Sequence, residues 1–314
     1  MRFTPSLFIG QNEGLSAYPI PLGPAPSPTP SVVTGSLVYF WDWAESGSVS
    51  YDPGSSAGAN PKTWDYRFYD KINNAYMYLF DMQLGTDIET NWCNIPGTGA
   101  KSGWMLGTSN AVNLGSTDLT IESWIDTQSG GNTYSRFGGE PLLLQTAVLS
   151  GQKDYQGTTV DFPNLYFAPT PLTYDLTSQL PYRQQNAGML DIGPPPPTGP
   201  AKIYISVESK PYFTILNDRF YHYVLTWNNS TGELKFYLNT FNVANANRPS
   251  STNLNFGTAE WHIGEDYDSN FDSTDTQRRS VKSRIGNQRV YNRILSKEEI
   301  LQNWYAEQSL YVEY

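Results

Sequence analysis

The residues with the clearest chemical potential lie in one acidic stretch, residues 266–272. Side-chain oxygens recur there at every second position, on Asp266, Asp268, Asn270 and Asp272. Carboxylate and amide oxygens are the ligands that a hard cation such as Ca²⁺ prefers. The stretch departs from a helix–loop–helix calcium loop, because Phe271 replaces the turn glycine and Gln277 replaces the final glutamate. A weak calcium site and a solvated acidic loop are therefore both open.

Catalytic side chains are few in this sequence. Enzymes that cleave glycosidic bonds need two carboxylates flanking the bond, and no Glu-x-Asp-x-x-Glu strand motif occurs; the nearest cluster, residues 265–268, lacks that spacing. The two histidines, His222 and His262, lie between aromatic or apolar residues on expected strands, which favours structural roles. Since a Gly-x-Ser-x-Gly nucleophile motif is also missing, we predict that the protein is not an enzyme.

Tryptophan is the remaining residue type with binding potential, because an exposed ring can stack on a sugar. Five tryptophans lie in or beside expected loops of the N-terminal half: Trp41, Trp43, Trp64, Trp92 and Trp104. These five are our candidate glycan contacts. Packing in the core is the alternative for each of them, since aromatic side chains supply much of the apolar area that a fold buries.

The elements that must position these residues are β-strands. Residues 118–125 alternate apolar and polar side chains, which is the period of a half-buried strand. Residues 221–227 and 233–238 predict two more strands, and the five-residue turn between them closes a hairpin. Further strands are expected at residues 36–42, 261–263 and 286–290. Short strands with Gly, Asn and Asp turns predict an all-β sandwich or jelly roll.

One helix is expected after these strands. Ser296 fits an N-cap and Glu299 fits the third helical position, which together make a capping box. Leu295 and Ile300 occupy the two positions of a hydrophobic staple. Trp304 continues the apolar stripe at helical spacing. The sequence therefore predicts a short C-terminal helix anchored on the sheet by Trp304.

Residues 290–300, VYNRILSKEEI, resemble the closing signature of laminin-G-like, concanavalin A-like jelly rolls. Residues 37–42, 118–125 and 221–243 resemble earlier parts of that family in the expected order, with Thr240 where the family's hairpin usually has glycine. The resemblance covers residues 36–306. It implies a sandwich of two antiparallel sheets, usually a binding or interaction module rather than an enzyme.

Composition limits the partners. The 314 residues carry a net charge of −10, which disfavours binding to nucleic acid and to anionic membranes. Cys93 is the single cysteine, so an intrachain disulfide is excluded. We find no apolar run long enough for a signal peptide or a membrane span. We therefore expect synthesis in a cytoplasm, with no nucleic-acid partner and no membrane insertion.

The first strand and the closing motif are also similar to those of virion proteins of tailed bacteriophages. An acidic, cysteine-poor chain suits assembly inside a lysing host cell. We predict a non-enzymatic structural or decoration protein of the virion, associated with capsid or tail, with adhesion to the host surface as an added role. A carbohydrate-binding, lectin-like module is the alternative, and a glycoside hydrolase comes third. No cofactor is expected apart from the calcium considered above.

Segments outside the resemblance are expected to contact other virion proteins or further copies of this chain. Residues 1–31 form a proline-rich, extended arm, and residues 145–201 form a long insertion with prolines and tyrosines. Two further segments are not expected to make these contacts: residues 44–62, a Gly/Ser-rich loop that does not fit a minimal sandwich, and residues 307–314, a tail. The candidate contact residues are Phe3, Leu7, Phe8, Ile9, Tyr18, Tyr166, Phe167, Tyr174 and Tyr182.

Overall fold

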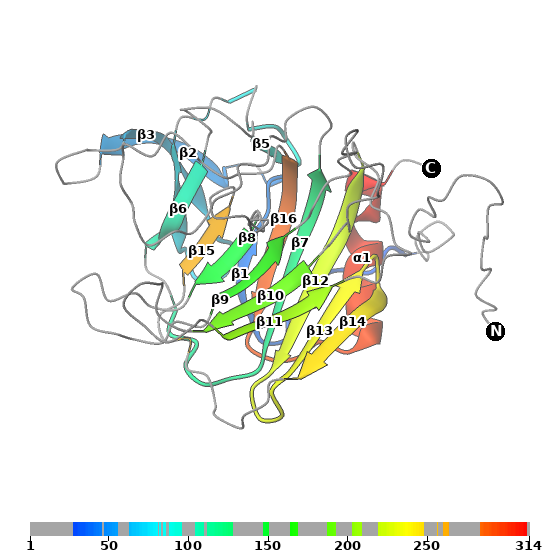
Figure 1. Cartoon of the computed structure of the whole chain (residues 1–314). Coiled ribbons are helices and arrows are strands. Elements are labelled where there is room, and N and C mark those ends of the chain that lie inside the picture. The colour runs from blue at the N-terminus through cyan, green and yellow to red at the C-terminus, as the bar shows by residue number, and fades with distance from the viewer. Residues whose placement is uncertain are drawn as a thin grey trace, which may run out of the picture.

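The computed structural model describes the sandwich and parts of its connections (Figure 1). The described residues are 28–45, 47–55, 63–80, 82, 84–85, 88–95, 104–109, 112–127, 147–150, 164–168, 187–192, 203–208, 219–247, 256, 260–263 and 283–312. They form two β-sheets and one α-helix. Within these ranges, no helix is long and apolar enough to cross a membrane.

The first sheet has seven strands, all paired antiparallel. Six of them lie in the order β1 (Leu37–Trp41), β16 (Ser283–Tyr291), β7 (Leu119–Thr127), β12 (Phe220–Asn228), β13 (Glu233–Leu238) and β14 (Phe241–Asn247). The seventh strand, β5 (Cys93–Ile95), pairs with the first three residues of β16. The β12–β13 hairpin closes through residues 228–232, as predicted, and Gly232 takes a positive φ of 72° there. The last strand of the chain thus lies between the first strand and β7.

The second sheet has nine antiparallel strands. Their order is β11 (Ile203–Glu208), β10 (Ala187–Ile192), β9 (Asn164–Ala168), β8 (Ala147–Ser150), β15 (Glu260–Ile263), β6 (Trp104–Ser109), β4 (Tyr76–Phe80), β3 (Thr63–Tyr69) and β2 (Val49–Ser55). Three of these strands, β8, β9 and β10, lie inside residues 145–201. The segment that the sequence identifies as an insertion therefore extends this sheet.

The core lies between the two sheets. On β7, Ile121 and Ile125 are buried in the core cluster, while Trp124 belongs to a separate cluster on the opposite face. Phe68 of β3 and Met77 of β4 meet them from the second sheet. The predicted strand and its alternation between two faces are confirmed, but the strand is buried on both faces rather than one, because α1 covers the face that carries Glu122 and Trp124. The predicted all-β class with two antiparallel sheets and a short C-terminal helix is also confirmed.

The helix α1 (Lys297–Tyr311) begins as the sequence predicts. Ser296 Oγ accepts a hydrogen bond from the Glu299 backbone N–H at 3.2 Å, and the Ser296 N–H donates to Glu299 Oε2 at 2.8 Å. Leu295 and Ile300 are buried in one cluster. Both the capping box and the hydrophobic staple are confirmed, and they stop the chain from fraying at the point where it leaves β16.

Trp304 anchors α1 on the outer face of the seven-stranded sheet. Its ring is buried 4.9 Å from that of Trp124. Tyr311 stacks 4.8 Å from the same Trp124, and its ring comes so close to Gly286 that a Cβ there would lie 2.6 Å away. The helix therefore runs to Tyr311 and includes residues 307–311, which the sequence assigned to a tail, because the buried stripe continues at helical spacing.

Between α1 and the sheet lies a buried group of polar side chains, which we name the α1 polar cluster: Glu122, His222, Arg289, Asn303 and Glu307. Arg289 donates to both carboxylate oxygens of Glu307 at 2.6 and 2.8 Å and, through Nε, to Glu122 at 2.8 Å. Asn303 Nδ2 also donates to Glu122, at 2.9 Å. The Arg289 guanidinium thus joins Glu122 of β7 to Glu307 of α1.

Burial controls the protonation of this cluster. Loss of water raises the pKa of Glu122, although the positive charge of Arg289 opposes that rise. Loss of water also lowers the pKa of His222 well below its usual value, and Arg289 adds to that lowering. His222 is therefore neutral in the folded protein. Its Nε2 lies 3.7 Å from Glu122 Oε1, beyond hydrogen-bond distance, and its ring stacks on Trp124.

The described end of the proline-rich arm is fixed to α1. Gln302 Nε2 donates to the Ser31 carbonyl at 2.8 Å, and the Val33 N–H donates to Asn303 Oδ1 at 2.7 Å. Tyr291 donates to the Val33 carbonyl at 3.0 Å. Residues 1–27, which hold the five arm residues predicted to bind partners, lie outside the described part of the chain. Any partner contact of the arm therefore remains a prediction.

Candidate binding pocket

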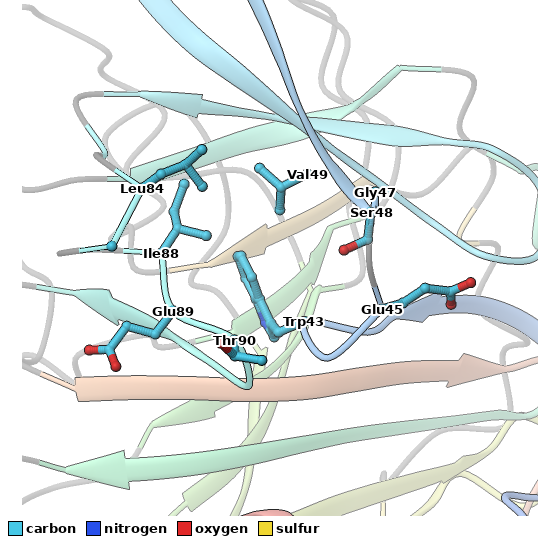
Figure 2. Close-up of a pocket in the computed structure, with 10 residues that line it drawn as sticks. Trp43, Glu45, Gly47, Ser48, Val49, Leu84, Ile88, Glu89 and Thr90 are labelled. Atoms are coloured by element: carbon cyan, nitrogen blue, oxygen red, sulfur yellow. The ribbon is translucent and has the colours of Figure 1, made fainter.

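A pocket of about 390 Å³ opens where the β1–β2 connection meets the segment between β4 and β5 (Figure 2). This volume lies within the range of small-molecule sites. Two backbone features shape the walls: the Gly85 N–H donates to the Ile88 carbonyl at 2.9 Å, and Gly47 takes a φ of 88° that favours glycine. The pocket is lined by Trp43, Glu45, Gly47, Ser48, Val49, Leu84, Gly85, Ile88, Glu89 and Thr90.

Trp43 forms the base of the pocket. Its indole N–H donates to the Gly286 carbonyl at 3.1 Å, and its backbone N–H donates to Asn287 Oδ1 at 2.9 Å. Its ring packs 3.9 Å from Phe68. These contacts leave 4% of the residue exposed and fix the ring in one orientation. The pocket therefore has a rigid aromatic base, with Val49 and Ile88 as apolar walls.

Two exposed carboxylates stand at the rim, and Figure 2 shows them on opposite sides of Trp43. Glu45 forms an ion pair with Lys71, which also reaches Asp42 at 3.1 Å. Glu89 accepts a hydrogen bond from Asn94 Nδ2 at 2.9 Å. Of the described residues that line the pocket, none is Lys or Arg. The rim is thus acidic, with hydroxyls from Ser48 and Thr90 beside it.

The structure places the candidate glycan tryptophans in different surroundings. Trp41 is fully buried and stacks on Tyr39, and Trp64 packs 4.0 Å from Tyr78. Trp92 is half-buried 5.6 Å from Phe220. Trp41, Trp43 and Trp64 are all buried, with 0%, 4% and 9% of the residue exposed, so none of the three offers the open ring face that stacking on a sugar needs. Trp43 alone of this group lines the pocket; Trp104 is placed on β6, with its side chain outside the description.

The remaining sequence candidates cannot be assigned to the pocket. The predicted calcium ligands Asp266, Asp268, Asn270 and Asp272 lie outside the described residues, as do Tyr174 and Tyr182. Tyr166 and Phe167 lie on β9, in the interior of the nine-stranded sheet. Within the described part of the chain, no group of three or more His, Cys, Asp or Glu could hold a metal ion.

Sequence reasoning missed most of the pocket. Glu45 and Ser48 fall in the Gly/Ser-rich loop that did not fit a minimal sandwich, which was a usable signal. Ile88 and Glu89 carried no signal, because only the turn at Gly85 and the bridge from Ile88 to Cys93 bring them to Trp43.

Comparison with known proteins identifies the type of sandwich. Residues 200–301 match a model described as the concanavalin A-like lectin/glucanases superfamily. The fold is a concanavalin A-like sandwich. That match and the two antiparallel sheets agree with the resemblance seen at residues 290–300. No curated protein sequence matches the chain.

Solved structures with a similar fold include domains of carbohydrate-active proteins. A Trypanosoma rangeli sialidase in complex with 2,3-difluorosialic acid is 13% identical over 89% of this chain and 34% of its own, with a TM-score of 0.46. Domain 4 of a Geobacillus stearothermophilus GH43 arabinanase, with arabinotriose, is 13% identical over 85% and 98%, with a TM-score of 0.38. A Ruminococcus gnavus CBM40 bound to sialyllactose is 12% identical over 60% and 83%, also at 0.38. The present chain matches about a third of the length of that sialidase.

Proposed function

We propose that this protein binds neutral carbohydrate in the pocket at Trp43, without cleaving it. The observation that carries the proposal is a pocket with an apolar lining, from Trp43, Val49 and Ile88, and an acidic, hydroxyl-bearing rim. A sugar ring has an apolar C–H face, which packs on apolar side chains, and a periphery of hydroxyl groups. Carboxylates accept hydrogen bonds from such hydroxyls, and hydrogen bonds to ionised groups are stronger than those between neutral groups.

Charge supports a neutral ligand. Glu45 and Glu89 face the pocket, and the whole chain carries a net charge of −10. Sialic and uronic acids would bring a further carboxylate into this field without a facing Lys or Arg among the described lining residues. Neutral hexoses and pentoses meet no such repulsion. The name of the matching superfamily, which includes lectins, agrees with binding of sugars.

A printed array of neutral and sialylated glycans tests the proposal. We expect saturable binding to neutral glycans and none to glycans whose terminal sugar is sialic acid. Glu89→Ala is expected to weaken binding roughly tenfold to a hundredfold, because a hydrogen bond to a charged group contributes about 1.5–3 kcal/mol. Glu233→Ala, on β13 of the other sheet, is the matched control and leaves binding unchanged. Silence on all neutral glycans overturns the proposal, and release of reducing sugar overturns the absence of cleavage.

A role in a virion is a second proposal, which is compatible with the first. Its support is the similarity of residues 290–300 to virion proteins of tailed bacteriophages, together with the attachment of Ser31 and Val33 to α1. That attachment fixes the point from which the proline-rich arm leaves the sandwich. Mass spectrometry of purified particles from the source of this gene tests the role. Absence of the protein from the particles would reject it.

A further inference from the structure

Tyr51 is the most exposed large hydrophobic residue in the described part of the chain, with 69% of its surface open to solvent. It lies on β2, the edge strand of the nine-stranded sheet. Val49, two residues earlier on the same strand, lines the pocket. Because alternate residues of a strand share one face, Tyr51 continues the wall formed by Val49, about 7 Å farther along the strand.

The neighbouring strand repeats this arrangement. Val49 is paired with Phe68 and Tyr51 with Tyr66. The ring centroids of Phe68 and Trp43 lie 3.9 Å apart, and those of Tyr66 and Tyr51 lie 5.6 Å apart in an edge-to-face arrangement. Tyr66 is half-buried against the core. An aromatic row therefore leads from the base of the pocket to Tyr51, and its outer ring is held on one side and open on the other.

The edge of β2 is poorly suited to the other common use of an exposed strand, which is pairing with a strand of a partner. Pro53 has no N–H to donate, and the strand register shifts between Tyr51 and Gly54. Both features are ways in which proteins block pairing at a sheet edge. The exposed surface at Tyr51 is thus available to a ligand that stacks on rings.

We propose that Tyr51 is a stacking position outside the pocket and that the ligand is a neutral oligosaccharide chain of two or more rings, lying from the pocket along β2. This inference rests on the proposed function, because it places the first ring of the chain in the pocket. The pocket supplies the choice of a neutral chain, since Glu45 and Glu89 both line the space that holds the first ring.

Calorimetry with neutral oligosaccharides of glucose, galactose, mannose and xylose, from one to six rings, tests the inference. We expect the affinity to rise roughly three- to tenfold between one ring and the chain, as stacking on one aromatic side chain allows. Tyr51→Ala removes that rise and leaves the single-ring affinity unchanged. Tyr51→Trp retains it. Phe241→Ala, an aromatic 37% exposed on β14 of the other sheet, is the control and has no effect.

The outcomes separate the two proposals. If single sugars and chains bind equally well to the unmodified protein, or if Tyr51→Ala retains the full rise, the stacking position at Tyr51 is rejected while the pocket stands. If Tyr51→Ala weakens single sugars as much as chains, Tyr51 acts on the pocket itself, and the inference is also rejected. If no neutral sugar of any length binds, the proposed function fails, and this inference fails with it.

Discussion

The protein places two pairs of glutamates in opposite settings. In the α1 polar cluster, Glu122 and Glu307 are buried and bonded to Arg289. At the pocket, Glu45 and Glu89 are exposed, and each is held by a single neighbouring residue. The first pair is closed to a ligand by burial, whereas the second pair keeps oxygens open to one. The type of residue is the same, and exposure decides between a structural and a binding role.

The difference is also one of energy. A buried ion pair gives little net stability relative to apolar residues, because both charges have lost their water. Removing one member is costly nevertheless, since the other charge stays buried without its partner. Exposed carboxylates carry no such penalty. The two regions should therefore respond oppositely to mutation: the cluster in stability and the pocket in binding.

The largest effect is expected for Arg289→Ala. The substitution leaves Glu122 and Glu307 buried without their guanidinium, which is expected to lower the free energy of unfolding by about 3–5 kcal/mol. Urea denaturation followed by tryptophan fluorescence measures the loss. Lys235→Ala removes a partly exposed ion pair with Glu233 and is expected to cost less than about 1 kcal/mol. A similar loss for both variants would contradict the comparison.

An intermediate effect on the free energy of unfolding is expected from His222 as the pH falls. His222 stays neutral in the folded protein because burial lowers its pKa, whereas in the unfolded chain it gains a proton below about pH 6.5. The unfolded state then binds more protons, so stability falls on acidification below pH 6.5, by at most about 1.4 kcal/mol per pH unit. Well above pH 6.5, His222 is neutral in both the folded and the unfolded state, so stability no longer depends on its protonation.

Comparison of the protein with His222→Gln isolates this effect. Glu122, whose pKa is raised, adds the opposite slope above its unfolded pKa, and it does so in both proteins. Urea midpoints between pH 7.5 and 5.5 should therefore converge for the two proteins as the pH falls. Parallel midpoints for the protein and His222→Gln would show that His222 is solvated.

The smallest effect on stability is expected at the pocket. Glu89→Ala is predicted to change the free energy of unfolding by no more than about 0.5 kcal/mol, because the side chain is exposed and bonded only at the surface. The same variant is the one expected to weaken glycan binding roughly tenfold to a hundredfold. Thermal denaturation beside the array measurement checks the pair of results. A destabilised Glu89→Ala would place the pocket carboxylates among the structural residues.

Local sequence was enough to predict the start of α1. Ser296 and Glu299, and likewise Leu295 and Ile300, interact within one helical turn, so their spacing alone specifies the cap and the staple. The alternation on β7 is local in the same sense. The α1 polar cluster was not predictable in this way, because residues 122, 289 and 307 meet only after β16 has paired with β7 and α1 has folded back.

The pocket shows the same limit. Its tryptophan was among the sequence candidates, but nothing local distinguished Trp43 from Trp41, two residues away on the chain. Both side chains lie in the core cluster, but Trp41 ends the strand β1, whereas Trp43 lies beyond it and also borders the pocket. The bond from the Trp43 indole N–H to the Gly286 carbonyl fixes its ring there. Which tryptophan borders a pocket thus depends on strand ends that only the folded sheet defines.

The attachment of the arm to α1 constrains the order of folding. The bond from the Val33 N–H to Asn303 closes a loop of 270 residues. Contacts so distant in sequence form late, since the chain must lose much of its freedom before they contribute stability. During synthesis, residues 28–35 emerge early but cannot dock until the chain has been made past residue 303. A nascent or truncated chain that ends before residue 303 therefore lacks the bonds that attach Ser31 and Val33 to α1, and these bonds form only once the sandwich is complete.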